Sequence, residues 1–240
     1  MKASPQEQAL LLDVQAVDTQ IAQLQHKRRS LPEHTEIAEG KVEWNRIAEE
    51  LVATQTEIAD TEQQVAKAEA DLAPVKQRLV RNQGRVDDGS MGAKELGSML
   101  EEIERIKLRI VELEDVQLEV MEKLETANAR LEELKAERAE LNTRMKAVIA
   151  KRDEQVAQID AELADLTAER SLLVKDIPAD VVALYDKIRE RSSGIGVGKL
   201  EGKRCSGCHL DQTATAMARY AAAAPDDIVR CEECDRILVR

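Results

Sequence analysis

Apolar residues recur every seven positions along most of this chain, and this spacing limits its fold more than any other feature. In one heptad series starting at Leu96, nine of twelve positions are apolar, and in the companion series starting at Met99 eight of eleven are apolar. An earlier series from Ile37 to Leu79 is apolar at all seven steps. Heptads sustained over this length predict a coiled coil, in which a narrow apolar seam replaces a rounded core.

The composition agrees with a helical seam and excludes several other classes. Of the 240 residues, 34% are charged and 43% are hydrophobic, while the aromatic content is one Trp, two Tyr and no Phe. Aromatic side chains supply much of the buried area of a rounded core, and the dominant residues are strong helix formers, so the composition argues against an all-β fold and an α/β enzyme. The periodic apolar residues argue against disorder. Neither an export signal nor a membrane-spanning apolar run occurs, so we expect a cytoplasmic protein.

The heptad pattern is interrupted at two places. Pro32 should break or kink the first helix, because proline lacks the backbone donor that a helix requires. The segment 82–92 is rich in glycine: Gly84 suits a helix C-cap, Gly89 suits a turn, and Ser90 suits the cap of the next helix. The sequence therefore predicts two helical arms joined near 82–92.

A short connection between two long helices favours antiparallel neighbours. We therefore predict a mostly α protein, with a long antiparallel coiled-coil hairpin over residues 1–176 and a small C-terminal zinc ribbon. Each arm of roughly 80 residues would extend about 120 Å as a straight helix. The alternative is a parallel dimer that tolerates the glycine-rich break. We expect a monomer, with a dimer as the alternative.

The pattern changes after residue 176. Residues 179–191 are predicted to form a separate short helix with Tyr185 on its apolar face, and the glycine-rich residues 191–198 read as a linker or hinge. We expect a short helix and hinge over 177–194 and a compact C-terminal module over 195–240.

The four cysteines form two CxxC pairs, Cys205 with Cys208 and Cys231 with Cys234, separated by 22 residues. Two such turns can present four thiolates to one ion as a tetrahedron, and four thiolates leave no open position for catalysis. We therefore predict one structural zinc ion. Disulfides are the alternative, but they are rare in a reducing compartment. His209 is the alternative fourth ligand, although four cysteines already suffice.

Within this module, short strands are predicted at 199–204, 228–230 and 237–240, and a helix at 213–224. Together they describe a small zinc ribbon, in which the metal replaces a core that so short a segment is unable to build.

Several segments of the chain resemble one bacterial family. They are KELGSMLEEIE at 94–104, LED at 113–115, EVME at 119–122, RCSGC at 204–208 and RCEECDRILV at 230–239. The chain resembles the C4-type zinc-ribbon proteins with an N-terminal coiled-coil hairpin, and its tail is similar to the actinobacterial members. This resemblance implies that the four cysteines are zinc ligands. His209 and Asp235 depart from the family pattern, because many such knuckles have Gly there.

The resemblance also implies that the protein is not an enzyme. Family members look like adaptors or chaperone-like regulators that bind proteins, and some are linked to nucleic acids. Our first hypothesis is therefore an adaptor that binds partner proteins through its coiled coil and ribbon, with no small-molecule substrate. Trp44 lies on the heptad stripe, where packing is the expected role and a binding platform is the alternative.

The alternative function is nucleic-acid binding through the ribbon. Residues 195–240 hold seven basic and seven acidic side chains, so the whole formal charge of -12 lies in residues 1–194. Nucleic-acid affinity depends on neutralising phosphates, and this balance does not favour it. A local patch remains a candidate for binding a nucleic acid or another partner; it would comprise Lys199, Lys203, Arg204, Arg230 and Arg236.

Overall fold

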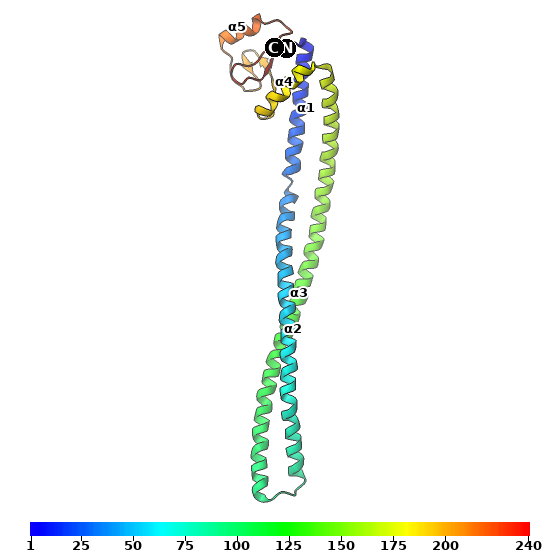
Figure 1. The fold of residues 1–240 in the computed structure, drawn as a ribbon, viewed down its shortest axis with the longest axis vertical. Coiled ribbons are helices and arrows are strands. Elements are labelled where there is room, and N and C mark those ends of the chain that lie inside the picture. The colour runs from blue at the N-terminus through cyan, green and yellow to red at the C-terminus, as the bar shows by residue number, and fades with distance from the viewer. The chain divides into compact units, whose positions relative to one another are not determined.

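The computed structural model describes every residue from Met1 to Arg240. The elements, labelled in Figure 1, are α1 (Pro5–Arg29), α2 (Pro32–Asp87), α3 (Ala93–Leu173), the 3-10 turn η1 (Val174–Asp176), α4 (Ala179–Arg191), β1 (Val197–Glu201), β2 (Arg204–Cys205), α5 (Ala214–Ala222) and β3 (Ile237–Val239). No helix carries an apolar stretch that is long enough to cross a membrane.

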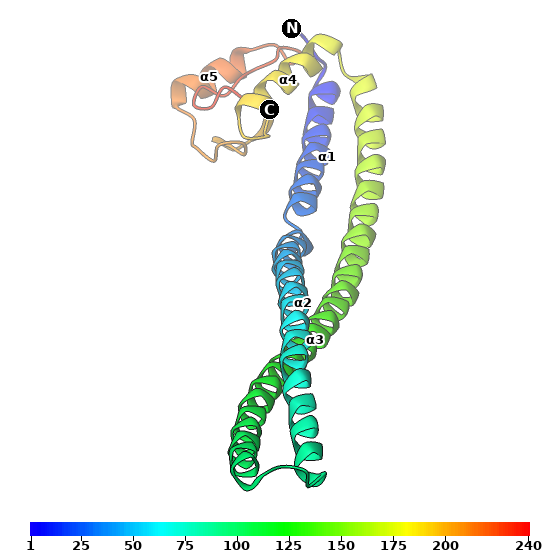
Figure 2. The same ribbon diagram turned by 60° about the horizontal axis from the view of Figure 1, so that its bottom comes forward.

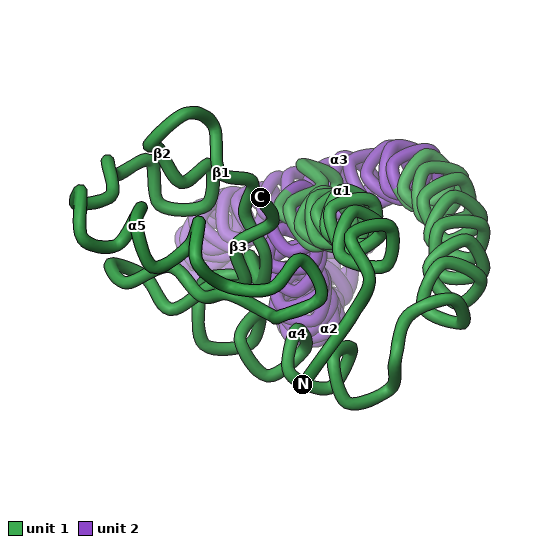
Figure 3. Tube along the Cα trace, turned by 90° about the horizontal axis from the view of Figure 1, so that it is seen from above, with its two compact units in different colours: residues 1–35, 149–240 green, residues 36–148 purple.

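The chain forms two compact units, which are coloured separately in Figure 3. Unit 1 consists of Met1–Thr35 and Ile149–Arg240, and unit 2 consists of Glu36–Val148. Unit 1 therefore combines residues from all three predicted segments: the start and end of the hairpin, the short helix and the ribbon.

Unit 2 contains the turn of a hairpin and the parts of α2 and α3 that flank it. The two helices run antiparallel to each other (Figure 2). Its seam contains two apolar clusters, Ile47, Leu51, Leu134 and Leu141 in one, and Leu72, Ile106 and Ile110 in the other. All of these residues except Ile47 occupy the predicted heptad series, and the predicted antiparallel coiled-coil hairpin is confirmed.

Charged side chains bridge the two helices beside this seam. Lys76 lies 2.6 Å from Glu114, and Arg130 lies 2.9 Å from Glu50. Exposed pairs of this kind add little stability each, but they favour one pairing of the helices over another. Gly40 leaves room for the side chain of Met145, which would clash with any Cβ at that position.

The connection between the arms is shorter than the predicted turn. α2 continues to Asp87, so Gly84 lies inside the helix and is not its C-cap. Gly89 has a φ of 68° and its N–H donates to the Val86 carbonyl at 3.2 Å, which confirms the turn there. Ser90 does not cap the next helix, because α3 begins only at Ala93.

In unit 1, α1 begins with a capping box. The Ser4 hydroxyl accepts from the Glu7 N–H, and the Glu7 carboxylate accepts from the Ser4 N–H. α1 ends at Arg29 and α2 begins at Pro32, which confirms the predicted break. A second proline, Pro74, lies within the continuous helix α2.

One hydrophobic core joins the helices of unit 1 to the ribbon. Leu11 and Val14 of α1 pack with Tyr185 of α4, and Val197 and Ile237 of the sheet belong to the same cluster. The sheet order is β2-β1-β3, with β1 antiparallel to β2 and parallel to β3. The predicted helix at 179–191 is confirmed as α4, and its Tyr185 is completely buried.

The segment that we expected to be a linker or hinge is held by α1 at several points. The Gly196 N–H donates to the Gln15 side-chain oxygen at 2.7 Å, and the Gln15 amide donates to the Gly194 carbonyl at 2.9 Å. A Cβ at Gly196 would lie 2.6 Å from the Tyr185 ring, so only glycine allows this close approach. The segment is therefore part of the packed junction between α4 and β1.

A buried ionic network lies beside this junction. Asp18 is 2% exposed and accepts hydrogen bonds from Arg170 Nε at 2.8 Å and from the Tyr185 hydroxyl at 2.8 Å. Arg189 lies 3.1 Å from the same carboxylate, and Arg170 also donates to Asp186 at 2.6 Å. The network connects α1, α3 and α4 within unit 1.

Candidate metal centre

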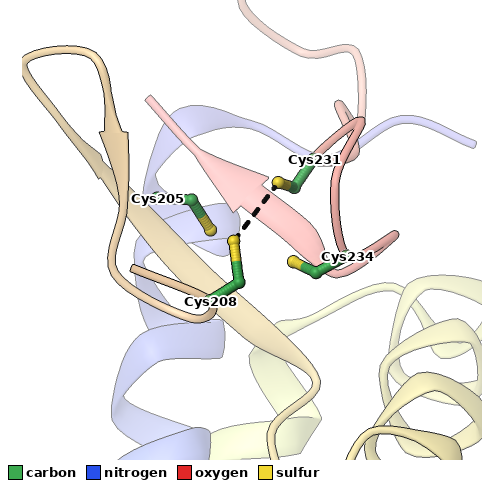
Figure 4. Close-up of side chains that lie close together, drawn as sticks. All are labelled: Cys205, Cys208, Cys231 and Cys234. Carbon is green, nitrogen blue, oxygen red and sulfur yellow. Dashed lines mark hydrogen bonds between the residues drawn. The ribbon is translucent and has the colours of Figure 1, made fainter. Parts of the chain in front are cut away.

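The four cysteine sulfurs come together between two turns of the ribbon. Cys205 ends β2 and Cys208 follows in the next turn, while Cys231 and Cys234 lie in the turn before β3 (Figure 4). Their sulfur atoms all lie within 4.8 Å of one another, and the Cys208 and Cys231 sulfurs are 3.9 Å apart. Four sulfurs at zinc-ligand distance of about 2.3 Å would be about 3.8 Å apart, so the spacing fits one structural zinc ion.

The two CxxC turns have matching backbone hydrogen bonds. The His209 N–H donates to the Cys205 carbonyl at 2.8 Å, and the Asp235 N–H donates to the Cys231 carbonyl at 2.9 Å. The backbone N–H of the first cysteine in each pair donates to a carbonyl five residues later. The Cys205 N–H donates to the Leu210 carbonyl at 3.1 Å, and the Cys231 N–H donates to the carbonyl of residue 236 at 2.9 Å. Each turn thus holds its two sulfurs on one side.

His209 and Asp235 occupy positions where glycine would be the natural choice. Their φ angles are 60° and 61°, in the left-handed region. Such angles cost free energy for a residue with a Cβ. The departure from the family pattern therefore leaves the knuckle geometry intact and adds backbone strain to both turns. His209 is exposed and does not belong to the group of potential ligands, which consists of the four cysteines.

An arginine precedes the first cysteine of each pair and supports its turn. Arg204 Nε donates to the His209 carbonyl at 2.7 Å, and Arg230 Nε donates to the Asp235 carbonyl at 3.0 Å. The sequence placed these arginines only in a candidate binding patch. The signal that could have revealed their structural role was present, because both occupy the same register before a CxxC pair.

Behind the sulfurs lies a small second core formed by Ala216, Tyr220 and Leu238 with two of the cysteines. The Tyr220 hydroxyl donates to the Gln212 side-chain oxygen at 2.9 Å, and Gln212 is itself buried. The same oxygen lies 3.5 Å from the Cys231 sulfur. The Tyr220 and Gln212 side chains therefore pack directly behind the Cys231 sulfur.

Burial disfavours the thiolate form of two of the four cysteines. Burial raises the pKa of the Cys231 thiol to about 12, and burial also raises the pKa of Cys208. Burial opposes ionisation of Cys234 as well, but donors from Arg236, together with the Cys231 and Cys208 thiols, outweigh burial and lower the pKa of Cys234. Zinc binds thiolates and supplies the positive charge that burial otherwise withholds, so the donor set fits this ion.

The predicted basic patch is largely engaged in local contacts. Lys203 pairs with Asp211 at 2.9 Å, and Arg230 pairs with Asp235. Arg236 donates to the Ile195 carbonyl at 3.0 Å and also to a second carbonyl at residue 192.

Of the five basic residues, Lys199 alone has an exposed side chain that is not engaged by a carboxylate or a carbonyl. The five residues therefore do not form one free cationic surface.

The ribbon elements agree in part with the predicted ones. The helix expected at 213–224 is α5, whose first turn is capped by the Thr213 hydroxyl, and strands occur near 199–204 and 237–240. The strand expected at 228–230 is not formed. Arg230 makes only an isolated bridge to Ile237, and the Leu238 N–H donates to the Val229 carbonyl at 2.8 Å.

Comparison with protein families matches two parts of the chain. Residues 14–193 match the CT398-like coiled coil hairpin domain, and residues 204–238 match the C4-type zinc ribbon domain. Neither description names a catalytic activity.

Similar proteins cover the whole chain. The uncharacterized protein Rv2229c of Mycobacterium tuberculosis is 30% identical over 240 residues, which is 100% of this chain and 98% of that protein. A solved structure from Mycobacterium smegmatis has a TM-score of 0.82 and 33% identity, and covers 100% of both chains. The structure of CT398 from Chlamydia trachomatis has a TM-score of 0.70 and 18% identity over 97% of both chains, a likeness of fold alone.

The hairpin, the convergent cysteines and these matches lead to one assignment: the chain belongs to the family of CT398-like coiled-coil hairpin proteins with a C4-type zinc ribbon, and it is an actinobacterial-like member.

Proposed function

We propose that this protein is a non-enzymatic adaptor or chaperone-like regulator that binds partner proteins through its coiled coil and ribbon. The supporting observation is a set of large apolar side chains on the outside of α2 and α3 in unit 2. Each is more than half exposed: Val42, Val52, Val80, Leu108, Val111 and Leu118. The outer positions of a two-helix coiled coil are normally polar, so these side chains offer contacts for other proteins.

We further propose that Cys205, Cys208, Cys231 and Cys234 coordinate one zinc ion with a structural role. The ion would hold together the turns that position β2 and β3. Because β3 belongs to the core that includes α1 and α4, loss of zinc should loosen the ribbon side of unit 1. The measurement is metal content per chain: one zinc in the intact protein and less in Cys205→Ser.

Nucleic-acid binding by the ribbon is the less supported alternative. Arg204 and Arg230 support the knuckle backbones, and Lys203 and Arg230 are paired with carboxylates. Such contacts compete with phosphate contacts. A complex that forms at low salt and weakens steeply with added salt and on Lys199→Ala would favour this alternative over the adaptor.

The adaptor proposal is tested by cross-linking the full-length protein in cytosol and identifying captured proteins. The intact protein is compared with the double variant Val111→Glu/Leu118→Glu, which changes two exposed side chains and leaves the seam untouched. We expect specific partners with the intact protein and reduced capture with the double variant. Cys205→Ser should weaken the partners that contact the ribbon. If no form captures a specific protein, the adaptor proposal is wrong.

A further inference from the structure

A groove lies between α2 and α3 in the part of unit 2 that is far from their connection, beside the one tryptophan of the chain. Its volume is about 640 Å³. The residues that line it are Trp44, Ala48, Leu51, Val52 and Gln55 of α2, and Lys135, Arg138, Ala139 and Asn142 of α3. Small side chains on both helices open the groove, because Ala48 and Ala139 leave space that larger residues would fill.

Trp44 does not behave as an ordinary seam residue. It is 37% exposed, whereas Ile47 and Leu51 nearby are buried. The Arg138 guanidinium lies over its ring, 5.2 Å from the ring centre. The large ring therefore forms one wall of the groove, and the Arg138 guanidinium over its face places a positive charge beside the groove. Val52, 64% exposed, adds an apolar surface at the other end.

The charge of this groove is unusual for the chain. Three other hollows along the helices have more carboxylates than cations in their lining: Glu57, Glu119 and Glu122 with Lys123 and Arg130 in one, Glu101 and Glu104 with Arg105 in another, and Glu162 and Asp165 with Lys27 in the third. The Trp44 groove has two cations and no carboxylate among its lining residues, in a chain whose net charge is -12.

The two cations of the groove are also available. Arg46, Arg130 and Arg144 of the same coiled coil are each paired with a glutamate, but Arg138 has no carboxylate partner. Lys135 pairs only with Glu132, and both side chains are more than half exposed. An exposed pair of this kind exchanges readily, because it is worth little in water.

We propose that this groove binds an acidic amphipathic helix of a partner protein. Apolar side chains on one face of that helix would contact Trp44 and Val52, and its carboxylates would pair with Arg138 and Lys135. The lining residues of α2 span 44–55, about 16 Å along a helix, which matches roughly three turns of a bound helix. Alanines on both sides of the groove allow a third backbone to approach closely.

The carboxylates on the surface around the groove also argue against an extended polyanion as its ligand. A nucleic acid or an anionic membrane would continue past the groove onto surfaces that carry carboxylates, such as Glu132 and Glu137. A short acidic helix places its charge only where the two cations lie. The proposal rests on the adaptor function proposed above, and it names one surface and the chemistry of its partner.

The test uses the full-length protein and a synthetic probe. The probe is a helical peptide of about 18 residues with leucines at i, i+3, i+4 and i+7, glutamates on both flanks, and no aromatic residue. A matched peptide has lysine in place of every glutamate. Trp44 is the one tryptophan, so its fluorescence emission reports occupancy of the groove directly.

We expect the acidic peptide to shift the Trp44 emission to shorter wavelength and to bind at least about tenfold more tightly than the basic peptide. Arg138→Glu should weaken the acidic peptide by a similar factor. Ala139→Glu, which places a carboxylate in the mouth of the groove, should also weaken it. Ala129→Glu is the matched control on the exposed side of α3 outside the groove, and it should leave the affinity unchanged.

Three results would overturn the proposal: no change in Trp44 emission with the acidic peptide, equal or tighter binding of the basic peptide, or unchanged affinity in Ala139→Glu. The cross-linking experiment distinguishes this failure from failure of the adaptor function. If specific partners are captured and the peptide titration fails, the adaptor uses another surface. If the titration succeeds and capture fails, the groove exists but the adaptor function is wrong.

Discussion

The ionic network around Asp18 should be one of the most sensitive points of unit 1. The Asp18 carboxylate is 2% exposed, and it accepts two hydrogen bonds at 2.8 Å, from Arg170 and from the Tyr185 hydroxyl. A second arginine, Arg189, lies 3.1 Å from it. These three partners come from α3 and α4, so the carboxylate of α1 holds the junction of three helices together.

Asp18→Asn removes the charge and keeps the size of the side chain. The two arginines would then share Asp186 as their remaining carboxylate, and Arg170 has a side chain that is only 22% exposed. Breaking a buried pair typically costs about 3–5 kcal/mol. Because Asp186 still compensates part of the charge and asparagine still accepts one hydrogen bond, we expect a loss of about 2–3 kcal/mol in the free energy of unfolding.

The assay is urea unfolding of the zinc-loaded protein, combined with hydrogen exchange of peptides from α4. Asp13→Asn is the control, because Asp13 lies on an exposed face of the same helix and should change stability by no more than about 0.5 kcal/mol. Exchange should accelerate in α4 and in the residues around Gly196, and not in unit 2. A loss below about 1 kcal/mol for Asp18→Asn, or an equal loss for the control, would refute the reasoning.

Three further predictions test other parts of the structure. His209→Gly should relieve the left-handed strain and raise the thermal stability of the zinc-loaded protein by up to about 1 kcal/mol, and a lower melting temperature would contradict this. Gly196→Ala should destabilise unit 1 by about 1–3 kcal/mol through a clash with the buried tyrosine, whereas Gly84→Ala, with open space inside α2, should stabilise its helix by about 1 kcal/mol in urea unfolding. Hydrogen bonds from two arginines lower the pKa of Glu50 below its ordinary 4.5. The Glu50 carboxylate should therefore contribute fully to the stability of unit 2 well above pH 4.5. This contribution should disappear as the pH falls through the lowered pKa of the folded protein. Urea midpoints followed by Trp44 emission at decreasing pH should fall less steeply in Glu50→Gln, and an unchanged slope would show that the carboxylate does not contribute.

The heptad series and the paired cysteines were enough to predict the coiled-coil hairpin and the zinc ribbon. Both depend on short-range spacing, either seven residues along a helix or two residues between thiols. Helix ends depend on less regular signals. Gly84 was expected to end α2 because glycine is common after helices, but the helix continues to Asp87 and ends where Gly89 adopts a positive φ.

The parts that the sequence did not reveal depend on contacts between distant segments. Asp18 reads as a surface residue of α1, and only the approach of Arg170 and Arg189, more than 150 residues later, makes it a buried carboxylate. The glycines at 194–198 read as a hinge, because glycine permits both motion and close packing. Here Gly196 serves close packing against Tyr185, which no local pattern distinguishes from motion.

The few aromatic residues also show where this chain departs from a simple helical seam. Tyr185 and Tyr220 are both buried in unit 1, the first in the core that joins α1, α4 and the sheet, the second behind the cysteines. In both places a helix packs against the strands of the ribbon, and one aromatic ring supplies a large buried area there. Trp44 is different, because it is half-exposed on a coiled coil that packs by aliphatic residues elsewhere. An aromatic ring that is partly exposed beside an arginine without a carboxylate partner is the basis of the binding role that we propose for Trp44.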